Sequence, residues 1–110
     1  MAKVKTSELT GAALDWAVAK CGGGAKDLML WLDAHALYDM YQYSTDWAQG
    51  GPIIEREGID VMFEGPEWYA YIRWEDKTLQ HDGPTPLIAA MRCYVASKLG
   101  DTIELPEELK

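Results

Sequence analysis

The sequence predicts a single α+β domain over residues 1–110, in which a small antiparallel β-sheet is packed by helices in a sandwich-like arrangement. Three observations predict this class. A chain of 110 residues has the size of one domain. Alternating apolar and polar residues near its middle predict a β-hairpin. Apolar residues at helical spacing lie both before and after that hairpin.

The first helix is predicted from Thr6 to Cys21. Thr6 and Ser7 offer capping hydroxyl groups, and the Glu8 carboxylate favours the dipole of the first turn. Gly22 to Gly24 then predict a turn. These glycines follow a helix rather than precede one, so they cannot direct backbone amides at a phosphate along a helix axis.

The stretch from Lys26 to Tyr43 fits two alternatives. Its leucines and methionines favour one helix, whereas its tryptophan and tyrosines suit two short strands, Leu28–Leu32 and Leu37–Tyr43. Periodicity does not decide between a helix and strands in apolar runs this short.

The next elements are a short helix and a hairpin. Pro52 at a first-turn position predicts a helix over Ile53–Glu57, which Gly58 ends. Strands are predicted at Ile59–Phe63 and at Trp68–Trp74, joined by a turn at Gly65 and Pro66.

The last part of the chain is predicted to contain a loop, a helix and a strand. Residues Glu75 to Gly83 are predicted as a polar loop. Thr85 as the cap and Pro86 as the first residue predict a helix that ends at Gly100. Thr102 to Leu105 predict a short edge strand.

The net charge of -8 and the pI near 4.6 argue against generic nucleic-acid binding, which needs clustered Lys and Arg. The two cysteines form no CxxC pair and are expected to be reduced packing residues. The sequence has neither a signal-peptide pattern at its start nor a run of about 18 apolar residues. We therefore expect a cytoplasmic protein without membrane association.

Three blocks of the sequence resemble a known family. They are SELTGAALDWAVAKC, YSTDWAQGGPIIEREGI and GPTPLIAAMRCYVASKLGD, which together cover about half of the chain. In this order they resemble the NinX-like family of bacteriophage accessory proteins. The resemblance implies a phage or prophage origin and a location in the host bacterial cytoplasm, and it implies no particular activity. It also favours short extended segments in the region from Gly22 to Gln42, where the likeness is looser.

The segment from Tyr43 to Gly58 is the main candidate for a binding site. Glycines ahead of a short helix expose backbone amides that can hold an anion or a nucleotide phosphate. Tyr43 and Trp47 can stack on a base, which contributes roughly 1–3 kcal/mol per base. Arg56 can bind a phosphate or carboxylate. The predicted ligand-binding residues are Tyr43, Ser44, Thr45, Asp46, Trp47, Gln49, Gly50, Gly51 and Arg56.

The same segment also has a structural interpretation. In it, Ser44 or Thr45 caps a turn, Asp46 accepts hydrogen bonds from loop amides, and Trp47 fills the core. The triplet from Glu55 to Glu57 is then a solvated charged face.

No cofactor, metal ion or catalytic group is predicted. His35 and His81 are far apart in sequence, and Asp33 with His35 is the only local pair, so the ligand spacing typical of zinc is missing. No pattern indicates an activated serine. Cys93 lies inside a predicted helix without a neighbouring base, and Arg92 is more typical of an ion pair or stem packing than of a ligand group.

We consider three functional hypotheses. The first is a non-enzymatic phage accessory protein that binds and neutralises a host component, either a defence protein or its nucleotide signal. The second is an acidic DNA-mimic decoy of a basic host protein, which would use Glu64, Glu67, Glu75, Asp76 and Asp82. The third is a small hydrolase or transferase that uses Asp46 and Glu55, which requires the two carboxylates to face each other. Exposed edge strands and aromatics also make a homodimer plausible.

Overall fold

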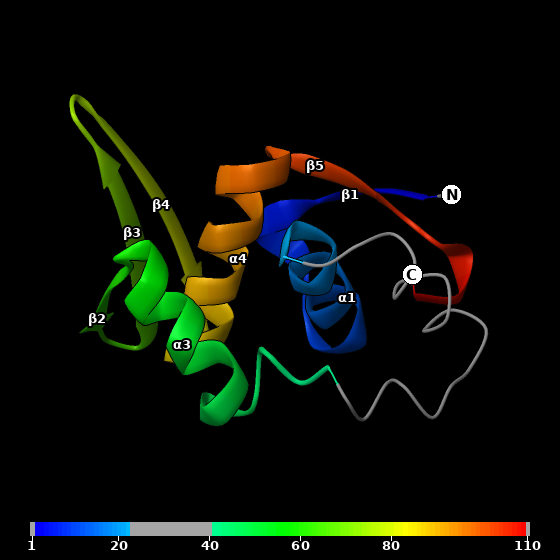
Figure 1. Cartoon of the computed structure of the whole chain (residues 1–110), viewed down its shortest axis with the longest axis horizontal. Helices are drawn as coiled ribbons and strands as arrows, with labels where there is room; N and C mark the ends of the chain where they lie inside the picture. Colours follow the sequence, from blue (N-terminus) through cyan, green and yellow to red (C-terminus); the bar gives the residue numbers. More distant parts are fainter. Residues whose placement is uncertain (1, 23–40, 110) are drawn as a thin grey trace.

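The computed structural model describes residues 2–22 and 41–109 and confirms the α+β class (Figure 1). Its helices are α1 (Gly11–Gly22), α3 (Trp47–Glu57) and α4 (Pro86–Leu99), with short 3-10 turns η1 (Thr6–Glu8) and η3 (Glu107–Leu109). Its strands are β1 (Ala2–Lys5), β2 (Asp60–Glu64), β3 (Glu67–Trp74), β4 (Lys77–Gly83) and β5 (Thr102–Leu105). No helix in this described part is long and apolar enough to cross a lipid bilayer.

Some of the sequence predictions lie almost entirely outside the described residues. They are the two alternatives for 26–43, the turn at Gly23 and Gly24, and the pair of Asp33 with His35. The described end of that stretch, from Tyr41 to Tyr43, forms coil and the start of a turn. Both the helix and the strand alternatives are therefore wrong for these last three residues.

Helix α4 is the central element of the fold. Figure 1 shows it between the sheet of β2, β3 and β4 on one side and α1 on the other. Residues on nearly all sides of α4 are buried, as expected for a helix that packs between two layers. The Thr85 hydroxyl accepts a hydrogen bond from the Ile88 amide at 3.1 Å, and Pro86 is the first helical residue, so the predicted start is confirmed.

Strands β2, β3 and β4 form an antiparallel sheet in that order. The predicted hairpin of β2 and β3 is confirmed, with Gly65 and Pro66 in its turn. The predicted polar loop from Glu75 to Gly83 is wrong, because most of it is strand β4, paired with β3. Its polar side chains alternate with half-buried Leu79 and His81, a pattern that suits a strand with one solvated face.

The first helix starts later than predicted. Residues Ala2–Lys5 pair with Thr102–Leu105, and the chain then makes a 3-10 turn before α1 begins at Gly11. Thr6 is buried, and its hydroxyl donates to the Gly100 carbonyl oxygen at 2.6 Å instead of capping a helix. The tertiary contact to Gly100 therefore replaces the predicted local cap.

Helix α3 starts earlier than predicted. The Asp46 side chain accepts a hydrogen bond from the Ala48 amide at 2.9 Å, which caps a helix beginning at Trp47. Pro52 consequently lies inside the helix, where it lacks the N–H that would bond to the carbonyl group of Ala48. The predicted end is confirmed, since Gly58 adopts a left-handed conformation with φ of 65°.

Candidate ligand-binding pocket

A cavity of about 270 Å³ lies between α1, α3, α4 and the segment that leads into α3. We call it the Arg56 pocket. Its apolar wall includes Val18 and Ala19 from α1 and Ile53 from α3. Its polar groups come from Tyr41, Tyr43, Gln49, Arg56 and Tyr94. The cavity is thus lined by four separate parts of the chain.

Arg56 is the central charged group of this pocket. Its Nε donates to Glu57 Oε2 at 3.0 Å, and its Nη2 donates to the Tyr94 hydroxyl oxygen at 3.2 Å. The hydrogen bond to Glu57 is the main reason that the pKa of Arg56 is raised, and it also lowers the pKa of Glu57. The guanidinium is therefore charged at neutral pH.

A second cation shares the same carboxylate. Lys98 Nζ lies 3.4 Å from Glu57 Oε1, and the Lys98 amine and the Arg56 guanidinium each lie 5.9 Å from the Tyr94 ring centre. Two cations with one carboxylate leave a local excess of positive charge on a chain with a net charge of -8. Such a local excess favours an anion at this place.

Tyrosines supply the aromatic surface of the pocket. The rings of Tyr41 and Tyr43 are stacked, with centres 6.0 Å apart and planes inclined by 25°. Burial raises the pKa of both Tyr43 and Tyr94, so their hydroxyl groups stay protonated and can donate hydrogen bonds at neutral pH. Aromatic faces next to a guanidinium suit a ligand that carries both a flat ring and an anionic group.

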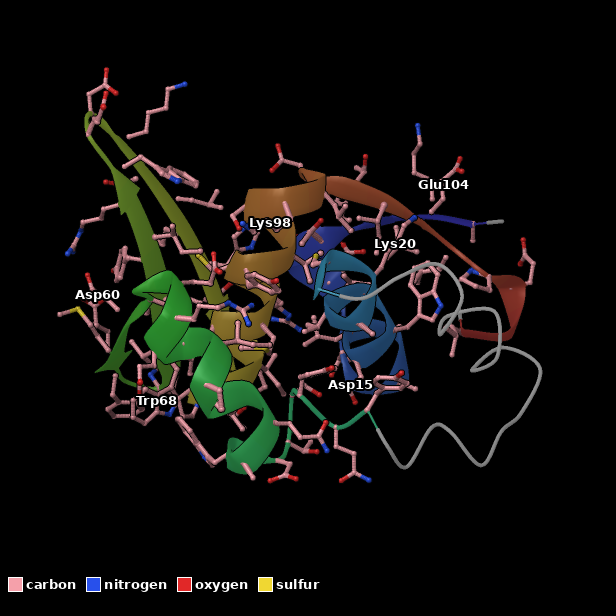
Figure 2. The ribbon with its side chains drawn as sticks, in the orientation of Figure 1. Asp15, Lys20, Asp60, Trp68, Lys98 and Glu104 are labelled. Atoms are coloured by element: carbon pink, nitrogen blue, oxygen red, sulfur yellow. The ribbon has the colours of Figure 1, made fainter. Side chains whose placement is uncertain are left out.

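The segment that carries Tyr43 is attached to α1. The Ser44 amide donates to Asp15 Oδ1 at 2.8 Å, and both residues are buried. Figure 2 shows Asp15 pointing from α1 toward this segment. Burial raises the pKa of the Asp15 carboxyl, and the hydrogen bond from the Ser44 amide opposes that rise. A second contact joins the Gln42 amide to Gln49 Oε1 at 2.9 Å.

The structure divides the predicted binding residues into three groups. Tyr43, Gln49 and Arg56 line the Arg56 pocket, whereas Ser44, Thr45 and Trp47 line a separate cavity of about 230 Å³ beside the start of α4. The remaining residues build helix α3. They are Asp46 as its cap, and Gly50 and Gly51 in its first turns.

Trp47 contradicts the structural interpretation of the sequence, in which it fills the core. Its side chain is 55% exposed, so it does not fill the core, and it is not among the residues that line the Arg56 pocket. Asp46, by contrast, has the structural role of binding a backbone amide.

Sequence reasoning missed Tyr94 and Tyr41 as pocket residues. Tyr94 is a buried residue of α4. A buried tyrosine hydroxyl nevertheless needs a hydrogen-bond partner, and this requirement was the available signal. The partner, Arg56, is 38 positions away and could not be identified from local sequence.

The arrangement does not assemble the proposed carboxylate pair. Asp46 caps the start of α3, and Glu55 is an exposed residue near its end. At roughly 100° and 1.5 Å per residue, nine positions place the two side chains on opposite sides of the helix and roughly 13 Å apart along it. The pair therefore fails the geometric requirement of the hydrolase or transferase hypothesis.

The environments of the two cysteines and of Arg92 indicate structural rather than reactive roles. Burial raises the pKa of both Cys21 and Cys93 to about 12, so neither is a thiolate at neutral pH. Arg92 donates to the backbone oxygens of Leu9 and Asp82 at 2.7 and 2.9 Å, a structural role that differs in kind from the predicted ion pair or stem packing. Within residues 2–22 and 41–109, no group of three His, Cys, Asp or Glu side chains could hold a metal ion.

The carboxylates of the decoy hypothesis lie at two ends of the sheet. Glu64 pairs with Glu67, and Asp82 pairs with Tyr69 at the same end. Glu75 and Asp76 form the turn at the opposite end of β3, whose eight residues span roughly 25 Å. The five residues therefore do not make one continuous strip.

A comparison with protein-family models gives a match. A family model described as Bacteriophage P22, NinX matches residues 5–98, which include all of α1, α3, the three-stranded sheet and nearly all of α4. A comparison with curated proteins finds no match.

Proposed function

Since this chain belongs to the bacteriophage P22 NinX family, as its three sequence blocks predicted, we propose that it is a phage accessory protein that binds and neutralises a host component without catalysis. The Arg56 pocket is the proposed binding site. The observation that carries the proposal is a charged guanidinium next to tyrosine rings, within a local excess of positive charge.

A nucleotide signal is the ligand that this chemistry favours. Arginine binds phosphate oxygens through paired N–H groups, and tyrosine rings stack on bases. Pockets for small molecules usually measure roughly 300–1,000 Å³. A cavity of about 270 Å³ therefore suits one nucleotide unit rather than a large cyclic oligonucleotide.

Thermal-shift measurements with mononucleotides, cyclic nucleotides and ADP-ribose test this proposal. We expect at least one of them to raise the melting temperature of the wild-type protein. Arg56→Ala should weaken that binding about ten- to a hundredfold, because it removes a charged hydrogen-bonding group worth roughly 1.5–3 kcal/mol. Arg56 is exposed enough for the variant to fold, since its side chain is 58% exposed.

Arg73→Ala is the matched control, because Arg73 is also exposed and pairs with a carboxylate, Asp60, and neither residue lines the Arg56 pocket. It should bind the nucleotide as the wild type does. If no nucleotide shifts the melting temperature, the nucleotide version is wrong. A protein target then remains, and mass spectrometry should find it with the wild-type chain and not with Arg56→Ala. Equal recovery with both chains would exclude the Arg56 pocket as the site.

A further inference from the structure

The three-stranded sheet has one face that no described helix packs against. Ala70 and Ile72 of β3 are buried on the side of α4. Side chains alternate along a strand, so Tyr69, Tyr71 and Arg73 lie on the opposite side. We call this side the outer face. Figure 2 shows Asp60 on it, directed away from α4.

The strand register defines the members of the outer face. Met62 pairs with Tyr69, and Tyr71 lies between Asp60 and Gln80. All of these side chains are half-buried or exposed, and Met62 is 50% exposed. Tyrosine and methionine at the centre of an accessible patch are typical of protein–protein interfaces.

The charges on the outer face are predominantly negative. Its carboxylates are Asp60, Glu64, Glu67 and Asp82, and its one described cation is Arg73. Arg73 is already paired with Asp60. Glu64, Glu67 and Asp82 therefore leave a net negative charge around the aromatic centre.

Contacts within the face hold its centre in place. The Tyr71 hydroxyl donates to Glu64 Oε2 at 3.2 Å, and the Arg73 guanidinium lies 5.6 Å from the centre of the Tyr71 ring. Side chains that are ordered before binding lose less conformational entropy when a partner arrives.

We propose that the outer face is a docking surface for a basic surface of another protein. Charge complementarity identifies the partner, because clustered Lys and Arg side chains would neutralise the carboxylates while their stems cover Met62 and the tyrosines. Nucleic acid has the wrong charge for this face. This docking surface shares no residue with the Arg56 pocket and goes beyond the function proposed for that pocket.

The negative charge of the outer face also makes a second copy of the chain the wrong partner. Contact between the outer faces of two copies would place carboxylates opposite carboxylates. Antiparallel pairing of two β2 edges would place Asp60 of one copy beside Glu64 of the other, and like charges opposite each other in a sheet are destabilising.

Photo-crosslinking in the host bacterium tests the proposal with the full chain. A benzophenone amino acid replaces the exposed Gln80 on the outer face, or the exposed Glu104 on β5 as a control position. The proposal expects a crosslink from position 80, but not from 104, to a peptide rich in Lys and Arg in another protein. A crosslink to a second copy, to nucleic acid or to a peptide without basic excess would overturn it, and so would no crosslink.

Charge reversal then tests complementarity with the purified crosslinked protein. The double variant Glu64→Lys with Asp82→Lys should weaken binding at least about tenfold at moderate salt. Glu8→Lys with Glu104→Lys changes the net charge equally at exposed positions elsewhere and should bind as the wild type does. Gln80→Arg, which removes no contact shown in the structure, should also weaken binding. Equal effects of the two double variants, or wild-type affinity in Gln80→Arg, would contradict the proposal.

Discussion

Asp15 shows how one buried charge positions the candidate site. It lies on α1, only 6% exposed, and accepts the hydrogen bond of the Ser44 amide. Burial disfavours the charged carboxylate, whereas the hydrogen bond from the Ser44 amide favours it. The segment with Tyr43 is therefore attached to α1 by a group that is costly to ionise.

The free energy of unfolding of Asp15→Asn, compared with that of the wild type, should be more favourable to the variant at pH 7 than at pH 4. The folded-state pKa of Asp15 is raised above its unfolded value near 3.9. At pH values between these two pKa values, the folded protein therefore binds more protons than the unfolded protein. The Asp15 contribution to stability is thus full below about pH 4 and is lost as pH rises through the folded-state pKa. Asparagine keeps an oxygen for the Ser44 amide and has no such loss.

Urea denaturation of both proteins across this pH range measures the difference. A free-energy gap that does not change with pH would contradict burial of the Asp15 carboxyl. Asp15→Ala serves as the second comparison, since it leaves the buried Ser44 amide without its acceptor and should be about 1–3 kcal/mol less stable than Asp15→Asn at every pH.

At the scale of elements, α3 depends on two adjacent glycines with different roles. Gly50 is buried where its Cα faces the Tyr43 carbonyl oxygen, and a side chain there would overlap that backbone atom. An added Cβ at Gly51 would only contact the Trp47 ring at 3.8 Å, an ordinary distance. Of these two glycines, therefore, only Gly50 packs closely on the segment that carries Tyr43.

Gly50→Ala should destabilise the protein by about 1–3 kcal/mol, because the backbone near Tyr43 must move. Gly51→Ala is the matched control and should stay within about 1 kcal/mol of the wild type, since the gain in helix propensity is offset by the restriction before Pro52. Thermal unfolding of both variants measures this contrast. Equal losses in the two would show that the approach of α3 to Tyr43 is not close in solution.

At the scale of the whole molecule, the two ends of the described chain close the fold around α4. Strand β1 pairs with β5, and the Thr6 amide donates to the Asp101 carbonyl oxygen at 2.8 Å. The Thr6 hydroxyl adds a partly buried hydrogen bond to Gly100 across 94 positions of sequence. These contacts join the segment before α1 to the end of α4, as Figure 1 shows.

Thr6→Val should lower the free energy of unfolding by about 1–2 kcal/mol. Valine has the shape of threonine but leaves the Gly100 carbonyl oxygen without this donor. Ser7→Ala, at the exposed neighbouring position, should change stability by less than about 0.5 kcal/mol. Chemical denaturation compares the two, and a Thr6→Val protein as stable as Ser7→Ala would mean that this bond adds nothing to closure of the fold.

The sequence correctly predicted features whose signals lie within a few residues. The turn at Gly65 and Pro66, the cap at Thr85 and the left-handed Gly58 each act on the adjacent helix or strand. Two local signals compete at the start of α3, and the cap is the stronger one. Pro52 predicts a start at the proline, but Asp46 binds the Ala48 amide and begins the helix earlier.

The sequence by itself determined the α+β class, the hairpin of β2 and β3, helix α4 and membership of the NinX family. Only the tertiary structure decided the pairing of β1 with β5, the strand character of β4 and the meeting of Arg56 with Tyr94. Caps, turns and alternation depend on neighbouring residues. Pairing partners and pocket walls depend on segments far apart in sequence, which meet only when the apolar faces around α4 are buried together.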